Sequence, residues 1–308
     1  MMTITAAMVK ELRELTGAGV MACKNALVET DGNQEEAIEV LRKKGEATAV
    51  KKSGRIAAEG IVYTVVKDGK AAIVEVNSET DFVAKNEKFQ TFVSNVAEQI
   101  VDSDAADMDA FMAEPWKLDA SKTVKDELVS QIAVIGENMN IRRFERITTD
   151  GVVVSYIHAG GRIGVLVEAD APQSPVVEEA LRNVAMQVAA LNAKFVSQDE
   201  ISEEYKEHEK AILLEQIKND PKESQKPEKV INGMIMGRLN KEFKEVCLLD
   251  QVYVKAEDGK QSVAKYLEEV SKEVGATVTL KKFVRFETGE GLEKKEENFA
   301  EEVAAQMK

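Results

Sequence analysis

The chain has 308 residues, of which 44% are hydrophobic and 31% are charged, and its formal net charge is -14 at pH 7. This length allows about two domains with buried cores, and the composition is typical of a globular, helix-rich protein rather than a disordered or fibrous one. The negative charge disfavours nucleic acid as a ligand, because such affinity depends mainly on Lys and Arg side chains that neutralise phosphates. We therefore expect no nucleic acid and favour a protein partner.

The sequence lacks a stretch that is long and apolar enough to span a membrane, and residues 1–14 interleave charged with apolar residues. A secretory signal needs an uninterrupted apolar segment. We therefore expect no membrane association and a cytoplasmic location. Cys23 and Cys247 lie far apart and lack the spacing of a metal site. This pattern fits a reducing compartment and predicts two core residues without a disulfide.

The first domain, residues 1–54, is predicted to be a bundle of three short helices. Thr5 can cap the first helix, and Asn33 followed by Glu36 indicates the cap of the third. A segment rich in Lys and Arg follows from residue 43 to 55. We interpret this basic segment as a solvated linker and place a domain boundary at its end.

A first α+β unit is predicted over residues 55–150. Two β-branched runs are joined by Asp68-Gly69, which is a strong signal for a hairpin. The helix that follows has apolar residues at helical spacing and therefore a face to bury on the sheet. The acidic segment 102–122 is interpreted as an irregular inserted loop. The predicted elements are strands 60–66 and 70–76 and a helix at 87–101.

The same order of elements returns in residues 151–196 and 242–287, which predict a second α+β unit. Asn95-Val96-Ala97-Glu98-Gln99 in the first helix matches Asn183-Val184-Ala185-Met186-Gln187 in the second. Turn, strand and helix recur in one order, so an internal duplication is favoured over a chance similarity of two hairpins. The predicted elements are strands 151–157, 163–169 and 278–286, with a helix at 175–191.

Two helical segments complete the predicted organisation. Residues 197–241 read as a helical hairpin that projects from the second unit, with Ile201, Tyr205, His208 and Ile212 recurring along one narrow seam. Such a seam is too narrow for a core helix and predicts self-association. Residues 288–308 predict a C-terminal helix that can dock on another surface.

Motifs that would indicate an enzyme are absent from the sequence. The chain has 2 His, and neither stands in a hydrolase or metalloprotease motif. The phosphate-binding P-loop pattern is also absent. Acidic residues are abundant, but such runs usually form solvated faces, which disfavours a carboxylate-pair enzyme. We therefore predict that the protein is not an enzyme and does not bind nucleotides by itself.

The stretch Asn77–Asn86 separates the first hairpin from its helix. Thr80 or Asp81 suits a helix N-cap, yet Phe82 follows at a position where side chains usually meet water. Exposed aromatic side chains are uncommon without a purpose. Physical reasoning alone therefore favours a Phe82 that folds under to cover the core, with a partner-binding role as the alternative.

These residues resemble those of a known family, translation elongation factor Ts, the guanine-nucleotide exchange factor for elongation factor Tu. The resemblance runs almost from end to end, and the T-D-F-V-A-x-N pattern around Phe82 is its most specific part. The matching stretches are Leu15–Met21 with Cys23-Lys24, Glu79–Asn86, Gly136–Asn138, Gly161–Glu168 and Arg285–Glu287.

The resemblance implies an α+β fold with an N-terminal three-helix bundle similar to ubiquitin-associated domains, duplicated core subdomains, a helical-hairpin dimerisation module and a C-terminal docking helix. It implies binding to elongation factor Tu, a possible homodimer or heterotetramer, and no cofactor, metal site or catalytic residue in this chain. Thr80, Asp81, Phe82 and Val83 would approach the magnesium of the GTPase. Further contacts would come from Val20, Met21, Lys24, Ile135, Gly136 and His158.

Two other classes of function remain as alternatives at this point. A translation-associated RNA-binding protein would need a basic face with aromatic side chains for stacking, and the charge and the single Trp116 disfavour it. A scaffold without exchange activity would not need a projecting Phe82.

Overall fold

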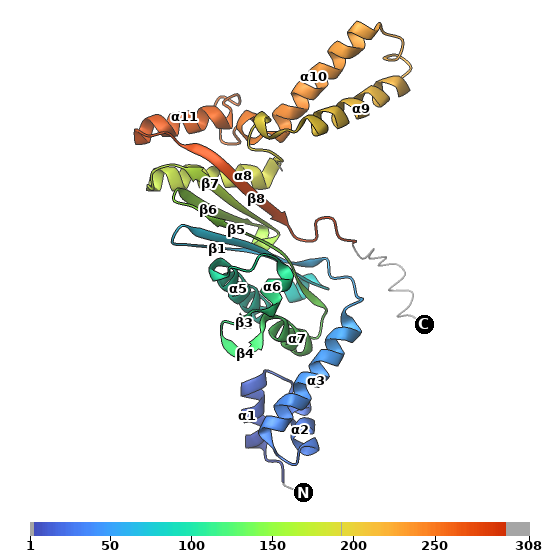
Figure 1. Cartoon of the computed structure of the whole chain (residues 1–308), viewed down its shortest axis with the longest axis vertical. Coiled ribbons are helices and arrows are strands. Elements are labelled where there is room, and N and C mark those ends of the chain that lie inside the picture. Colours follow the sequence, from blue (N-terminus) through green and yellow to red (C-terminus); the bar gives the residue numbers. More distant parts are fainter. Residues whose placement is uncertain (1–2, 192, 294–308) are drawn as a thin grey trace.

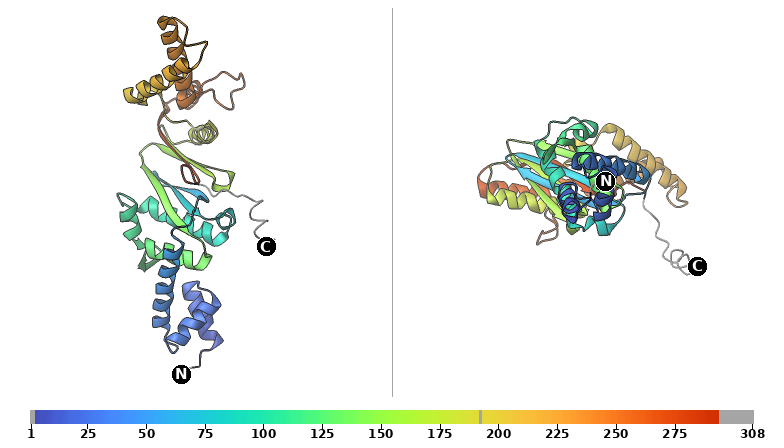
Figure 2. Two further views of the ribbon diagram at one scale, coloured as in Figure 1. Left: turned by 90° about the vertical axis from the view of Figure 1, so that its right-hand side faces the viewer. Right: turned by 90° about the horizontal axis from the view of Figure 1, so that it is seen from below.

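The computed structural model describes residues 3–191 and 193–293. Its helices and strands form a mixed α+β architecture, stacked in layers along the long axis of the molecule (Figure 1). The N-terminal helices lie at one end and a two-helix arm projects at the other, with two sheets between them, as the side view also shows (Figure 2). None of the described helices is long and apolar enough to cross a membrane.

The N-terminal bundle contains the three helices that the sequence predicts. Thr5 accepts a hydrogen bond from the backbone N–H of Met8, and Asn33 accepts one from that of Glu36, so both predicted caps are confirmed. Cys23 is buried in its core and is a free thiol. The helices are α1 (Ala6–Thr16), α2 (Val20–Glu29) and α3 (Gln34–Lys52).

The interpretation of residues 43–55 as a solvated linker is wrong, because α3 continues through nearly all of them to Lys52. This extension packs against α7 (Val124–Ile135). A Cβ atom on Gly45 would lie 3.5 Å from Cβ of Ala133, so the glycine allows the two helices to approach closely. The Arg42 guanidinium lies 3.5 Å from the Asp126 carboxylate at the same contact.

The first α+β unit has a three-stranded antiparallel sheet in the order β1-β2-β5. Asp68 and Gly69 both have positive φ, of 50° and 74°, which is the geometry of a tight two-residue hairpin turn. Helix α5 covers one face of the sheet with Phe89, Phe92 and Val96. The elements are β1 (Glu59–Lys67), β2 (Lys70–Ser78), α5 (Glu87–Asp102) and β5 (Met139–Thr148).

The segment 102–122 is not an irregular loop. It contains α6 (Met108–Ala113) and a small hairpin of β3 (Pro115–Trp116) and β4 (Asp119–Thr123). Phe111 and Trp116 are buried in the core beneath α5. These two aromatic side chains anchor the segment, so the insert is part of the first core.

The second unit repeats this plan with a sheet in the order β6-β7-β8. Helix α8 covers the sheet, and α11 packs on α8. Residues 252–255 form only an isolated bridge between Val252 and Ser262. The elements are β6 (Val152–His158), the short helix η1 (Ala159–Gly161), β7 (Ile163–Asp170), α8 (Pro175–Leu191), η3 (Leu248–Asp250), α11 (Val263–Val274) and β8 (Thr279–Glu287).

A buried glutamine performs the same task in each unit. Gln99 of α5 donates to the carbonyl of Pro115 (3.0 Å) and accepts from the N–H of Lys117 (2.9 Å). Gln187 of α8 donates to the carbonyl of Val252 (2.9 Å) and accepts from the N–H of Val254 (2.8 Å). Each side chain therefore satisfies both backbone groups of an extended segment beside its helix.

The two sheets pack face to face, which leaves each with one face on a helix and one on the other sheet (Figure 1). A Cβ atom on Gly164 would lie 2.4 Å from Cγ1 of Val62, so only glycine fits where β7 crosses β1. The shared apolar cluster consists of Val62, Ala71, Ile73, Ile147, Val153, Leu166, Val284 and Phe286.

A buried carboxylate, Glu75, closes one end of this sandwich. A β-bulge in β5 at Arg142 brings two successive guanidinium groups to it, from Arg142 (3.0 Å) and Arg143 (2.6 Å). The backbone N–H of Gly289, just beyond β8, also donates to it at 2.7 Å. Burial alone would raise the pKa of this carboxyl, but its hydrogen bonds and the Arg143 charge lower the pKa below the ordinary value. Glu75 thus ties the chain after β8 to the first sheet.

The arm consists of two antiparallel helices, as predicted, and it follows a short helical turn, η2 (Gln198–Glu200). The predicted end of the arm at residue 241 is wrong, because its second helix continues to Val246 and packs Phe243 in the arm's own apolar cluster. The predicted seam is only partly correct. Ile201 lies in the core of the arm, but His208 and Ile212 face solvent, and Ile212 is 39% exposed. The predicted C-terminal docking helix, residues 288–308, is wrong at its start, because residues 288–293 form turns, and residues 294–308 lie outside the described residues. The arm helices are α9 (Glu203–Asn219) and α10 (Glu228–Val246).

We predict that Gln187→Leu lowers the free energy of unfolding by about 2 to 4 kcal/mol, because two backbone groups lose their hydrogen-bond partner. Urea denaturation followed by circular dichroism measures the change. Gln216→Leu is the matched control, since Gln216 is exposed on α9. Equal stabilities of the two variants would contradict the assigned role of Gln187.

Candidate partner-binding site

The stretch 78–86 forms a projecting turn at the end of β2. Thr80 caps the four-residue helix α4 (Asp81–Ala84) by accepting from the N–H of Val83 at 3.3 Å. Ala84 is buried and Val83 is half-buried against the core, whereas Phe82 is 81% exposed. The prediction that Phe82 covers the core is therefore wrong. Its neighbours occupy the inward positions, and the aromatic ring points away from the fold.

Asp81 gives the turn a negative charge beside Phe82. Its carboxylate is exposed and lies 2.6 Å from Nζ of Lys85. The hydrogen bond from Lys85 lowers the pKa of Asp81 below its ordinary value. The carboxylate is therefore ionised at neutral pH and accessible to a partner.

The loop between α7 and β5 meets this turn. Gly136 ends α7 with a φ of 89°, a conformation that favours glycine, and it is exposed, while Ile135 packs on the first core. The next residue, Glu137, accepts from the Thr80 backbone N–H (3.0 Å) and from the Thr80 hydroxyl (2.7 Å). The structure thus joins two predicted contact segments that lie far apart in sequence.

A second carboxylate makes the reciprocal contact, from the turn to the loop. Glu79, beside Thr80, accepts from the backbone N–H of Asn138 at 2.6 Å. The sequence analysis assigned no role to Glu79 or Glu137, although both lie in the stretches that carry the family resemblance. One signal in the sequence could have found them: each glutamate adjoins a predicted contact residue, Glu79 next to Thr80 and Glu137 next to Gly136.

The end of α3 attaches to the same place. Lys52 donates to the carbonyl of Gly136, and the Arg55 guanidinium lies 3.3 Å from the Glu79 carboxylate. The Asn138 side chain donates to the carbonyl of Arg55 at 2.8 Å. The N-terminal bundle is therefore connected to the turn and the loop through polar contacts.

The other predicted contact residues lie elsewhere. Val20, Met21 and Lys24 are exposed on α2, in the bundle at one end of the molecule (Figure 1). His158 is exposed at the end of β6, where its Nδ1 atom lies 3.0 Å from the Tyr156 hydroxyl. The structure thus brings residues 80–83 together with Ile135 and Gly136. The α2 residues lie in the N-terminal bundle, and His158 lies at the β6–β7 hairpin of the second sheet.

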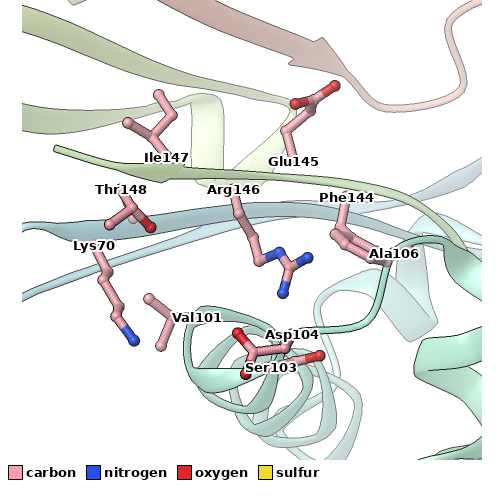
Figure 3. Close-up of a pocket in the computed structure, with 11 residues that line it drawn as sticks. Lys70, Val101, Ser103, Asp104, Ala106, Phe144, Glu145, Arg146, Ile147 and Thr148 are labelled. Atoms are coloured by element: carbon pink, nitrogen blue, oxygen red, sulfur yellow. The ribbon is translucent and has the colours of Figure 1, made fainter.

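A surface hollow of about 470 Å³ lies between the end of α5 and β5. Figure 3 shows Arg146 pointing from β5 toward Ser103 and Asp104, while Glu145 points away. Arg146 also donates to the carbonyl of Ala105. None of the predicted contact residues lines this hollow. Within residues 3–191 and 193–293, no group of three or more His, Cys, Asp or Glu could hold a metal ion.

The candidate site is therefore a convex one. It presents an aromatic ring and a carboxylate on a braced turn, instead of enclosing a small molecule between side chains.

Comparison with known proteins identifies the family. A family model described as elongation factor TS matches residues 79–290. Elongation factor Ts of Clostridium perfringens is 55% identical over 305 residues, which cover 98% of each chain. The proteins of that name from Clostridium novyi and Clostridium tetani are 53% and 50% identical over 308 residues, covering 99% of each chain. The chain belongs to the elongation factor Ts family.

Family membership gives the chain a guanine-nucleotide exchange role in translation elongation and implies interaction with elongation factor Tu. The alternatives, an RNA-binding protein or a scaffold without exchange activity, are not favoured.

We predict that Phe82→Ala changes the free energy of unfolding by less than about 0.5 kcal/mol, because the ring has little contact with the fold. Phe89→Ala is the matched control. Phe89 is fully buried, so its truncation should cost about 3 to 5 kcal/mol. Thermal unfolding of the two variants measures the difference, and a large loss for Phe82→Ala would mean that its ring packs on the fold in solution.

Proposed function

We propose that the chain binds elongation factor Tu with GDP bound and promotes GDP release by disturbing the Mg²⁺ site of the GTPase through Thr80, Asp81, Phe82 and Val83. The observation that carries this proposal is the exposure of Phe82, 81%, on a turn that is braced at both ends. An exposed aromatic ring on a braced turn loses little conformational entropy when it enters an apolar pocket.

The negative charge of Asp81 supports the magnesium part of the proposal. Magnesium bridges the phosphates of a bound nucleotide, so a factor that shifts the ion or its ligands weakens nucleotide binding. Asp81 lies directly beside Phe82, and insertion of the ring brings the carboxylate to the same region of the partner. By reciprocity the nucleotide weakens binding of the factor, so rebinding of a nucleotide releases it. No covalent bond is made or broken, and the chain acts as an exchange factor rather than an enzyme.

Further contacts are proposed from other segments of the chain. Val20, Met21 and Lys24 of α2 would contact the nucleotide-binding domain, and their exposure supports this role. Ile135 and Gly136 would contact the partner next to the turn. His158 would contact it from the second unit, where it stands exposed at the hairpin.

The proposed domain organisation follows these roles. Residues 1–54 form a bundle similar to ubiquitin-associated domains, and residues 55–150 form the first core subdomain. Residues 151–196 and the segment from the end of α10 to residue 287 form its duplicate, and the paired roles of Gln99 and Gln187 support the duplication. Residues 288–308 are proposed to dock on the partner. A factor that serves translation elongation in this way would work in the cytoplasm.

We predict that Phe82→Ala slows the release of fluorescent GDP from elongation factor Tu by about thirtyfold. Full burial of such a side chain in a partner is worth about 2 kcal/mol, which corresponds to that factor. Stopped-flow release measurements at several concentrations of the chain give the rate. Leu118→Ala is the matched control, because Leu118 is 66% exposed between β3 and β4, away from the turn.

Asp81→Asn keeps the shape of the side chain and removes its charge, so release should slow with little change in thermal stability. Full exchange activity of Phe82→Ala would refute the proposed mechanism. Equal slowing of GDP release by Leu118→Ala would show that the effect is not specific to the Phe82 turn.

We also propose that the arm, residues 197–241, is a dimerisation module that supports a homodimer or a heterotetramer with the GTPase. Ile212 on α9 and Val230 and Met236 on α10 are exposed. Exposed apolar side chains on both helices of a projecting arm favour contact with another molecule.

We predict that the chain sediments as a dimer at about 50 μM and that Ile212→Glu shifts it toward monomer, because a charge would be buried at the contact. Sedimentation velocity measures the shift. Gln173→Glu, in the exposed segment before α8 and outside the arm, is the control for added charge. A monomeric parent chain at this concentration would refute the dimerisation role.

A further inference from the structure

We propose that Glu79 and Glu137 are positioning residues that hold Phe82 in the orientation needed for nucleotide exchange. They form a reciprocal pair, which we call the carboxylate clamp. Each carboxylate crosses from its own segment to a backbone N–H of the other. This inference rests on the proposed function of the Phe82 turn and names the groups that keep the turn in place.

The turn needs such support because it is short. Helix α4 has four residues, and a single helical turn is unstable by itself because its formation fixes several dihedral angles for one hydrogen bond. Phe82 adds no packing, since its ring is exposed. The order of the turn therefore depends on the burial of Ala84 and on the polar contacts of Thr80.

Thr80 is the residue through which the clamp acts. Its hydroxyl donates to Glu137 at 2.7 Å and accepts from the N–H of Val83 at 3.3 Å. The contact with Glu137 thus orients the same hydroxyl that caps α4. Hydrogen bonds to an ionised carboxylate are roughly twice as strong as neutral ones, which makes the clamp stronger than the cap alone.

The two carboxylates differ in how cleanly they test this role. Glu79 also lies 3.3 Å from the Arg55 guanidinium, so its removal would disturb the attachment of the N-terminal bundle as well. Among residues 3–191 and 193–293, the hydrogen bonds of the Glu137 side chain are confined to Thr80. Glu137 is therefore the residue to change.

The experiment measures the maximal rate and the half-saturating concentration for release of fluorescent GDP from elongation factor Tu by the full chain. We expect Glu137→Ala to lower the maximal rate about tenfold, the effect of one charge-assisted hydrogen bond. The half-saturating concentration should change less than about twofold, because the proposed contacts of α2 and His158 do not need the clamp. Glu137→Gln keeps one acceptor oxygen and should fall between the parent chain and Glu137→Ala. Glu268→Ala, an exposed carboxylate on α11, is the control.

The decisive comparison places Glu137→Ala in a Phe82→Ala background. If the clamp acts by positioning the ring, its removal should change release by less than about twofold there, because there is no ring left to position. Equal slowing in both backgrounds would overturn the clamp inference but not the proposed function. A normal release rate per folded molecule, with a lower melting temperature, would do the same. Normal release by Phe82→Ala itself would overturn the proposed function, and the inference would fall with it.

Discussion

The facing surfaces of two three-stranded sheets are buried against each other through residues such as Val62, Ile73 and Leu166. Strand β2 lies at the centre of the first sheet and is buried along almost its whole length, so both of its faces need a cover. Helix α5 supplies one and the second sheet supplies the other. Because β2 runs directly into the stretch that carries Phe82, the projecting turn starts from a firmly held strand.

Stability and the proposed partner recognition depend on different neighbours within this turn. Ala84 faces the core, Thr80 caps the short helix, and Phe82 is left free of packing. Because the ring buries little apolar surface in the fold, nearly all of its surface is available for burial in a complex. We propose that the polar contacts of Glu137 hold the ring outward. Glu137 lies 57 residues from Thr80 along the chain.

Buried polar side chains connect the layers where apolar packing ends. Gln99 and Gln187 each satisfy two backbone groups of an extended segment, and Glu75 accepts from β5 and from the chain just after β8 at the end of the sandwich. Such groups are costly to bury without partners, so they specify one arrangement of the segments they bind. The attachment of α3 through Lys52 and Arg55 differs, because these contacts are exposed to solvent.

The sequence by itself determined the features that depend on neighbouring residues. The caps at Thr5 and Asn33 and the Asp68-Gly69 turn involve groups within a few residues of each other, and the apolar faces of α5 and α8 follow from spacing alone. Only the tertiary structure decided that the basic segment continues α3, because its partner α7 lies far along the chain. The same holds for the order of the segment 102–122, which depends on the burial of its aromatic residues beneath α5, and for the outward ring of Phe82. A local sequence pattern does not predict such long-range contacts, since their free energy arises only once distant segments pack together.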